Sequence, residues 1–123
     1  MATAKQFEDL GVWQDARALV KTIYATSKQR AFYRDIGLRE QIRRAASSTM
    51  SNIAEGFERG TRKEFIQFLN IARRSSAELA SMALTFERMK ILDTTATSSV
   101  LEMADKVGRK LTSLIRHLGR GNR

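Results

Sequence analysis

The stretch NIAEGFERGTRKEF, residues 52–65, decides the fold because it contains a helix end and a helix start with almost no loop between them. Gly60 can take the left-handed conformation that commonly ends a helix. Thr61, followed three residues later by Glu64, has the spacing of a capping box that opens a new helix. Two helices joined so closely must run antiparallel, so this stretch predicts a helical hairpin.

Apolar residues recur at helical spacing on both sides of this hairpin and in two further segments. Short breaks separate the segments, at residues 31–37 and in a Thr/Ser-rich turn that follows Asp93. Four helices are predicted, at residues 10–30, 38–59, 62–91 and 97–118, and a basic tail follows at 119–123. Short connections between helices of comparable length predict an all-α, antiparallel up-down-up-down four-helix bundle in a single domain of residues 1–123.

The composition agrees with this fold and excludes several classes of protein. The 123-residue chain has no proline, which helix interiors reject, and no cysteine, which excludes disulfides and thiolate chemistry. It has no apolar run of about 18 residues, and its first residues lack the apolar core of a secretory signal. We therefore expect a cytoplasmic protein with no membrane partner.

No group of residues in the sequence is typical of a catalytic or metal site. His117, the one histidine, lies near the end of a predicted helix, where a solvated imidazole complements the helix dipole. The sequence lacks the Glu-x-x-His pairs of di-iron bundles, a glycine-rich phosphate loop and a nucleophile spaced from a base. We expect no enzyme activity, no catalytic residue, no metal and no cofactor.

One face of the helix at 38–59 carries polar side chains three and four residues apart. Two interpretations stay open: a polar network that fixes the register of the helices, or a ligand or nucleic-acid site. Glu55 lies too far along the helix from Arg44 to bond it, so a cation on another helix is its predicted partner. The residues predicted to form the network or an interface are Arg39, Arg43, Arg44, Ser48, Asn52, Glu55, Arg73 and Arg74, of which the last two are the candidates for Glu55.

The apolar arc of the same helix covers about half of its circumference, which is wider than one bundle seam requires. Arg39 and Arg43 lie on the flank of this arc that Met50, Ala54 and Phe57 occupy. Long basic side chains in such a place lie along apolar surface or pair with acids of another subunit. We therefore expect the chain to associate with itself.

The charge of the chain is strongly positive, with 22 basic and 13 acidic residues and a net charge of +9. Such a balance is typical of proteins that contact polyanions, although it also serves solubility alone. In the helix at 97–118 most of the basic residues lie opposite the apolar face, where they can reach phosphates. The predicted nucleic-acid-binding residues are Lys106, Arg109, Lys110, Arg116 and Arg120. Few aromatic residues are expected at the surface, so stacking on unpaired bases is not predicted.

Several short motifs resemble one known family over residues 7 to about 118. The motifs are Phe7-x-x-Leu10-x-Val12-Trp13-Gln14, Gln41-Ile42-Arg43-Arg44-Ala45-Ala46-x-Ser48, Asn52-Ile53-Ala54-Glu55-Gly56, Glu64-Phe65 and Ser75-x-x-Glu78-Leu79. They are similar to those of the bacterial four-helix-bundle proteins encoded in intervening sequences of 23S ribosomal RNA genes. The chain departs from the family before the second helix, where Asp35-Ile36-Gly37 replaces the usual Ser or Thr cap.

This resemblance implies properties that the residue pattern alone does not. Members of the family form ring-shaped homopentamers, and no catalytic residue is established for them. A more distant likeness links the chain to the accessory proteins of diversity-generating retroelements, which bind nucleic acid and a reverse transcriptase through basic surfaces. We therefore expect a homo-oligomer, with a pentamer as the implied form, that binds RNA or DNA and has a possible protein partner. The alternative is a structural or protein-interaction scaffold with no nucleic-acid role.

Overall fold

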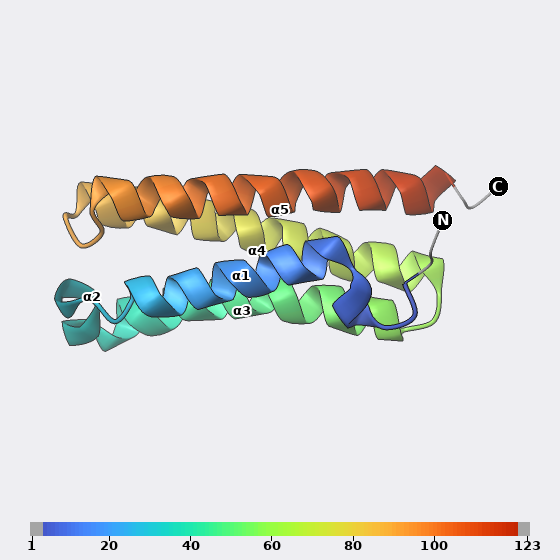
Figure 1. Cartoon of the computed structure of the whole chain (residues 1–123), viewed down its shortest axis with the longest axis horizontal. Coiled ribbons are helices and arrows are strands. Elements are labelled where there is room, and N and C mark those ends of the chain that lie inside the picture. Colours follow the sequence, from blue (N-terminus) through green and yellow to red (C-terminus); the bar gives the residue numbers. More distant parts are fainter. Residues whose placement is uncertain (1–3, 121–123) are drawn as a thin grey trace.

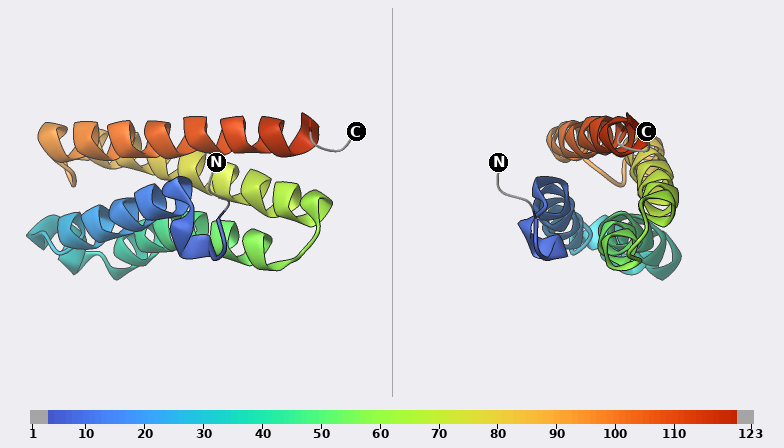
Figure 2. Two further views of the ribbon diagram at one scale, coloured as in Figure 1. Left: turned by 45° about the vertical axis from the view of Figure 1, so that its right-hand side comes forward. Right: turned by 90° about the vertical axis from the view of Figure 1, so that its right-hand side faces the viewer.

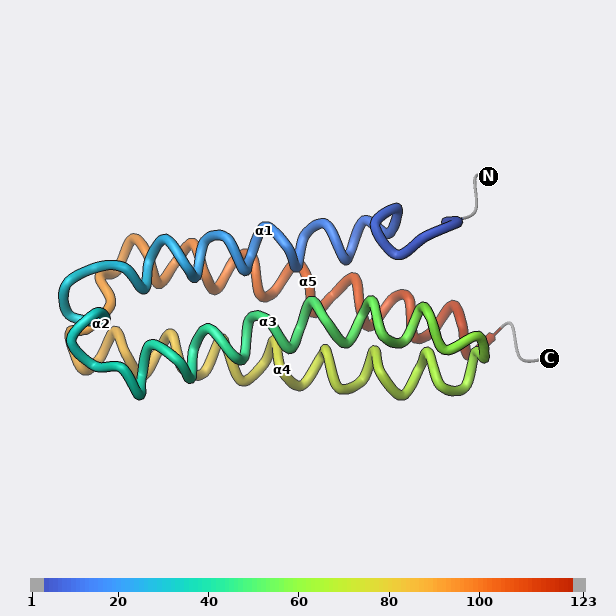
Figure 3. The backbone as a smooth tube through the Cα atoms, turned by 90° about the horizontal axis from the view of Figure 1, so that it is seen from below, coloured from blue at the N-terminus to red at the C-terminus, as the bar shows by residue number. Residues whose placement is uncertain are grey.

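The computed structural model describes residues 4–120, and every regular element in that range is a helix (Figure 1). The elements are η1 (Phe7–Asp9), α1 (Gly11–Thr26), α2 (Arg30–Arg34), α3 (Ile36–Glu58), α4 (Arg62–Arg88) and α5 (Thr94–Arg120). The four long helices alternate in direction, as Figures 1 and 3 show. The predicted all-α fold is confirmed.

The helices occupy the four corners of the bundle in chain order (Figure 2). α1 contacts α3 and α5, and α4 contacts the same two helices, while the diagonal pairs make no contact. This arrangement brings α5 between α1 and α4, although α1 and α5 come from opposite ends of the described chain. The side chains on the two flanks of α5 therefore face different neighbours.

The hairpin between α3 and α4 has the local chemistry that the sequence predicts. Gly60 adopts a φ of 85°, in the left-handed region that glycine occupies without steric cost. The Thr61 hydroxyl oxygen accepts a hydrogen bond from the Glu64 N–H at 3.2 Å and donates one to the Glu64 carboxylate at 3.0 Å. The first bond caps α4 by satisfying the Glu64 N–H, and the second holds the two side chains together. The chain reverses direction within three residues of the end of α3.

The core is apolar, and its buried polar groups are paired with the backbone. The Thr49 hydroxyl donates to the carbonyl of Ala45 at 3.0 Å, and the Ser76 hydroxyl donates to the carbonyl of Ala104 on α5 at 3.0 Å. Both residues are buried. The largest fully buried side chains include Leu19, Ile23, Phe32, Ile42, Ile53, Leu69, Leu79, Val107 and Leu111.

The predicted linker at 31–37 contains a further helix, α2, and α1 ends at Thr26 rather than at residue 30. Phe32 of α2 has no exposed surface, and its ring meets that of Phe86 edge-on, with centroids 5.4 Å apart. Burial of this one aromatic side chain therefore explains why the segment is folded over the end of the core. α3 begins at Ile36 because the Asp35 carboxylate caps it, accepting the Leu38 N–H at 3.1 Å.

The last helix is longer than predicted at both ends. α5 starts at Thr94, where Asp93 accepts the Ala96 N–H at 2.7 Å, and it continues through Gly119 to Arg120. The predicted helix end at Gly119 is therefore wrong, and the rest of the predicted tail, residues 121–123, lies outside the described residues. Because α1 begins only at Gly11, it leaves the last turns of α5 uncovered (Figure 1). The predicted core residues Leu114, Ile115 and Leu118 are accordingly only half-buried.

None of the helices in residues 4–120 has the length and apolar character needed to cross a membrane.

Gly56 is buried at a close approach of α3 to α4, and this closeness allows a direct test. A Cβ atom at this position would lie 2.7 Å from the Cβ of Phe68 and 3.0 Å from Cδ1 of Phe65. We expect Gly56→Ala to lower the free energy of unfolding by roughly 1–3 kcal/mol, because the two helices must separate.

Gly108→Ala is the matched control, since a Cβ atom there has no neighbour within 4 Å. This change removes a flexible residue from a helix interior and should raise stability by about 0.5–1 kcal/mol. Urea unfolding followed by circular dichroism measures both changes. Equal stability of the two variants would show that the close approach at Gly56 is not needed.

Candidate nucleic-acid interface

The polar stripe on α3 is divided between two neighbours. The hydroxyls of Ser48 and Ser75 are hydrogen-bonded at 2.9 Å, which links α3 to α4. Asn52 donates from its side-chain amide to the Ser48 carbonyl at 2.8 Å and to the Ser48 hydroxyl at 3.0 Å. These three side chains form a connected network between the two helices, as a register-fixing role requires.

The arginines predicted to pair with Glu55 lie elsewhere. Glu55 makes an ion pair with Arg59, one turn further along α3, at 3.1 Å. Arg73 donates to the Asn70 side chain on its own helix at 2.7 Å. Arg44 and Arg74 are exposed. A cation four residues away on the same helix is reached more easily than one on a neighbouring helix. The sequence prediction sought the partner of Glu55 on another helix and therefore missed Arg59.

Two of the predicted nucleic-acid-binding lysines are engaged with α1. Lys106 and Lys110 lie one turn apart on the flank of α5 that faces α1, and both approach Asp15. The Lys106 ammonium is 3.5 Å from the Asp15 carboxylate, and the Lys110 ammonium forms the closer ion pair. The Asp15 side chain is only 22% exposed, so water screens this cluster less than it screens a surface pair.

The remaining predicted cations of α5 face solvent. Arg109 pairs with Asp105 on the same helix at 2.9 Å, and both side chains are largely exposed. Arg116 and Arg120 are exposed, and neither takes part in the ion pairs found within residues 4–120. The fold thus separates the five predicted residues into two that bridge helices, one that is locally paired and two that are available.

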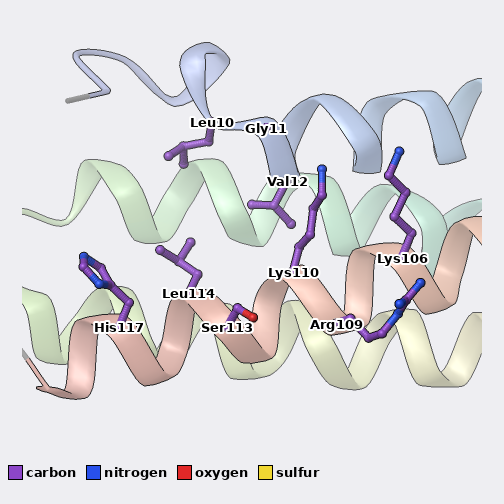
Figure 4. Close-up of a pocket in the computed structure, with 9 residues that line it drawn as sticks. All are labelled: Leu10, Gly11, Val12, Lys106, Arg109, Lys110, Ser113, Leu114 and His117. Atoms are coloured by element: carbon purple, nitrogen blue, oxygen red, sulfur yellow. The ribbon is translucent and has the colours of Figure 1, made fainter. Parts of the chain in front are cut away.

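A cleft of about 630 Å³ lies between the start of α1 and the second half of α5 (Figure 4). Figure 4 shows Leu10 and Val12 pointing toward α5, and Leu114 pointing toward α1. Lys106 and Lys110 extend along one part of the cleft toward α1, and His117 stands at the opposite end. The cleft is therefore apolar at its centre, and its two lysines already have a carboxylate partner.

A second depression, of about 700 Å³, runs along the outer groove between α4 and α5. Small residues such as Ala77, Ala80 and Gly108 line it. Arg73 of α4 and Arg109 and Arg116 of α5 stand around it, and Asp105 is the one acid in the lining. Guanidinium groups bind phosphates with two parallel hydrogen bonds, and small side chains allow a close approach of a sugar-phosphate backbone. The α4–α5 groove therefore has the chemistry of a phosphate-binding surface.

Arg39 and Arg43 have aromatic partners that the sequence analysis missed. The Arg43 guanidinium lies over the ring of Tyr24, 4.5 Å from its centroid, and the Arg39 guanidinium lies 4.9 Å from that of Tyr33. Tyr24 is 39% exposed, whereas its neighbour Ile23 is fully buried in the core. The sequence indicated these arginine–tyrosine contacts through the strongly basic composition around Tyr24 and Tyr33.

No group of three or more histidine, cysteine, aspartate or glutamate side chains within residues 4–120 is placed to hold a metal ion.

Residues 8–113 match the family described as the 23S rRNA-intervening sequence protein. Among solved structures, the chain is similar to a protein of unknown function from the S23 ribosomal protein family of Bacteroides thetaiotaomicron. The two share 21% sequence identity with a TM-score of 0.77, over 85% of this chain and 97% of that one. This likeness concerns the fold. Among curated protein sequences none matches the chain.

The pairing of Asp15 with two lysines predicts a measurable electrostatic contribution to stability. We expect Asp15→Asn to lower the free energy of unfolding by up to about 1 kcal/mol at low salt, because two ammonium groups lose their counter-charge. The loss should shrink as salt is raised, since screening weakens the pairs. Asp105→Asn is the control: its pair with Arg109 is exposed and lies within one helix, so no measurable change is expected. A loss for Asp15→Asn that is independent of salt would contradict the electrostatic explanation.

Proposed function

The chain belongs to the family of 23S rRNA-intervening sequence proteins, and we propose that it is a non-enzymatic, self-associating bundle that binds RNA or DNA through a basic surface on α4 and α5. The family is one of undefined role, so the proposal rests on this chain's own residues. Its main support is the α4–α5 groove, in which three arginines surround a surface of small residues.

The distribution of charge over the helices supports this assignment. α4 and α5 together carry ten basic and five acidic side chains, a net charge of +5. α1 and α3 together carry five basic and four acidic side chains, a net charge of +1. The excess positive charge of the long helices is therefore concentrated on the half of the bundle that contains the groove. Neutralising phosphates there would release counterions, which drives most non-specific nucleic-acid binding.

The available arginines are better candidates than the paired lysines. Arg116 and Arg120 can meet a phosphate without first leaving a carboxylate. Lys106 and Lys110 would have to give up Asp15, so part of their attraction to a phosphate would be offset. We therefore assign the main contacts to Arg116 and Arg120. Arg73 and Arg109, which are bonded within their own helices, stand beside the same groove as secondary contacts, and we give the two lysines a structural role.

A scaffold function without nucleic acid is the second candidate, and the same ion pairs favour it. Three of the five predicted binding residues of α5 are already paired with aspartates. A chain whose charge served only solubility would use its cations in this way.

The two candidates differ in what happens when the available arginines are reversed. For Arg116→Glu combined with Arg120→Glu, we expect affinity for a short RNA duplex to fall on the order of tenfold or more at low salt. The slope of log affinity against log salt should become shallower by about 2, because two phosphate contacts are lost. Fluorescence anisotropy of a labelled duplex measures both quantities.

The matched control is Lys5→Glu combined with Arg17→Glu. It changes the net charge by the same amount, at one exposed position just before η1 and at one on α1. It should weaken binding much less than the α5 variant. Equal losses for the two variants would assign binding to net charge alone, and no binding by the wild-type protein at low salt would leave the scaffold as the function.

Self-association is proposed on separate grounds. The apolar residues Leu114, Ile115 and Leu118 are half-buried on the last turns of α5, near the N-terminal end of α1. Partly exposed apolar surface of this kind is typical of protein interfaces. We expect light scattering to give a multiple of the 13.9 kDa chain mass, five-fold if the family resemblance holds for assembly. A mass of one chain at micromolar concentration would contradict this part of the proposal.

A further inference from the structure

Two arginine–tyrosine stacks lie at one end of the bundle, and Arg116 and Arg120 at the C-terminal end of α5 lie at the other. Figures 1 and 3 show this end, where α1 stops, α2 turns the chain and α3 begins. The stacks pair Tyr24 with Arg43 and Tyr33 with Arg39. We refer to these four residues as the Tyr–Arg platform. The two arginines are one helical turn apart on α3, so the stacks stand on adjacent turns of a rigid helix.

Hydrogen bonds hold the two arginines of the platform in place. The Arg43 Nε donates to the hydroxyl of Ser27 at 2.7 Å, and Ser27 is itself buried, with 1% of its surface exposed. The Arg39 Nη1 donates a longer bond, 3.4 Å, to the backbone carbonyl of Tyr33. A guanidinium fixed by such contacts loses little further freedom when a ligand binds on it.

The tyrosine rings are exposed to a degree that packing does not explain. Tyr33 is 63% exposed and Tyr24 is 39% exposed, and the neighbouring Ile36 is 62% exposed. Exposed aromatic and apolar side chains gathered in one place are the informative exception to ordinary burial. Each ring keeps surface available for a planar group to stack on.

The segment that carries the platform is strongly basic. Residues 21–44 contain seven basic and two acidic side chains, a net charge of +5. None of these seven cations enters the ion pairs found within residues 4–120. Of the two acids, Asp35 caps α3 and Glu40 takes no part in those ion pairs, so two acids stand against seven cations and most of the positive charge of the segment is not offset.

One further atom of the platform is unsatisfied. The Arg39 Nε is buried and has no hydrogen-bond partner among the described residues. A buried donor without a partner costs free energy, so an acceptor that a ligand brought to this atom would be stabilising.

We propose that the Tyr–Arg platform binds unpaired bases of a single-stranded nucleic acid. The proposal rests on the nucleic-acid function proposed above and adds a preference for single strands. Every base has a flat π-face that stacks on tyrosine rings and on guanidinium planes. Lys28, Arg30 and Arg34, all exposed around α2, supply the charge that follows the sugar-phosphate backbone. The α4–α5 groove is lined by no aromatic side chain, so it offers phosphate contacts without stacking.

A second copy of the chain is the rival occupant of this surface. Symmetric pairing would bring the same cations of both copies together, with no excess of acids to offset them. Like charges facing each other across an interface oppose association. A nucleic acid supplies flat bases that can stack on the tyrosine rings, and it also supplies the negative charge that the platform lacks.

The test compares a labelled single strand of about 12 nucleotides with a duplex of the same length. The variant Tyr24→Ala with Tyr33→Ala removes both rings, and Tyr24→Phe with Tyr33→Phe keeps them as the matched control. Affinity is measured by fluorescence anisotropy at low salt. A second readout is the quenching of 2-aminopurine placed within the strand, which reports stacking directly. Thermal unfolding confirms that each variant is folded.

We expect the alanine variant to lose affinity for the single strand on the order of tenfold per ring, with loss of the quenching. Its affinity for the duplex should change by less than about twofold, and the phenylalanine variant should bind both like the wild type. Three results for the alanine variant would each overturn the proposed role of the platform. They are unchanged binding of the single strand, an equal loss of affinity for the strand and the duplex, and a change in oligomer mass without a change in RNA affinity. Failure of the wild type to bind either nucleic acid would instead overturn the proposed function and the platform with it.

Discussion

The close approach of α3 and α4 at Gly56 is the constraint on which the rest of the bundle depends. A glycine there lets the backbone of α3 lie against Phe65 and Phe68, and the left-handed Gly60 reverses the chain at once. With this hairpin fixed, α1 packs on α3 and α5 packs on α4, which leaves α1 and α5 as neighbours. Every surface described above follows from that order. The groove of arginines is the outer side of the α4–α5 contact, and the apolar cleft is the place where the short α1 fails to cover α5.

Because α5 packs between two helices, its lysines and its arginines face different surroundings and have different roles. Its lysines on the α1 side meet Asp15, which lies 95 positions before Lys110 in the chain, and they help to join α1 to α5. Its arginines on the outer side point into solvent beside the groove. A helix that looks uniformly basic in sequence thus has a structural flank and an available flank. A similar division occurs on α3. Ser48 bonds to Ser75 of α4 and is itself contacted by Asn52, whereas Arg39 and Arg43 stack on tyrosines of α2 and α1.

Local chemistry explains which features could be predicted from the sequence. Gly60, Thr61 and Glu64 act within a few residues of one another, so the hairpin was predictable, and long apolar periodicity located the four main helices. α2 is too short to show a period, and its burial depends on Phe86, which is distant in sequence. Lys90 ends α4 at a φ of 61° without the usual glycine, so that helix end carried no signal. The partners of Lys106, Lys110, Arg39 and Arg43 lie on other elements and could not be inferred from one helix at a time.

Folding leaves two sets of cations available to nucleic acid and withdraws a third, and this division can be measured. In backbone NMR spectra recorded while a short single-stranded RNA is added, each amide reports its own surroundings. We expect shifts that cluster at residues 24–43 and at Arg73, Arg116 and Arg120, with little change around Asp15, Lys106 and Lys110. Shifts concentrated on the Asp15 cluster and the cleft beside it, or no shifts at low salt, would rule out this division of the cations.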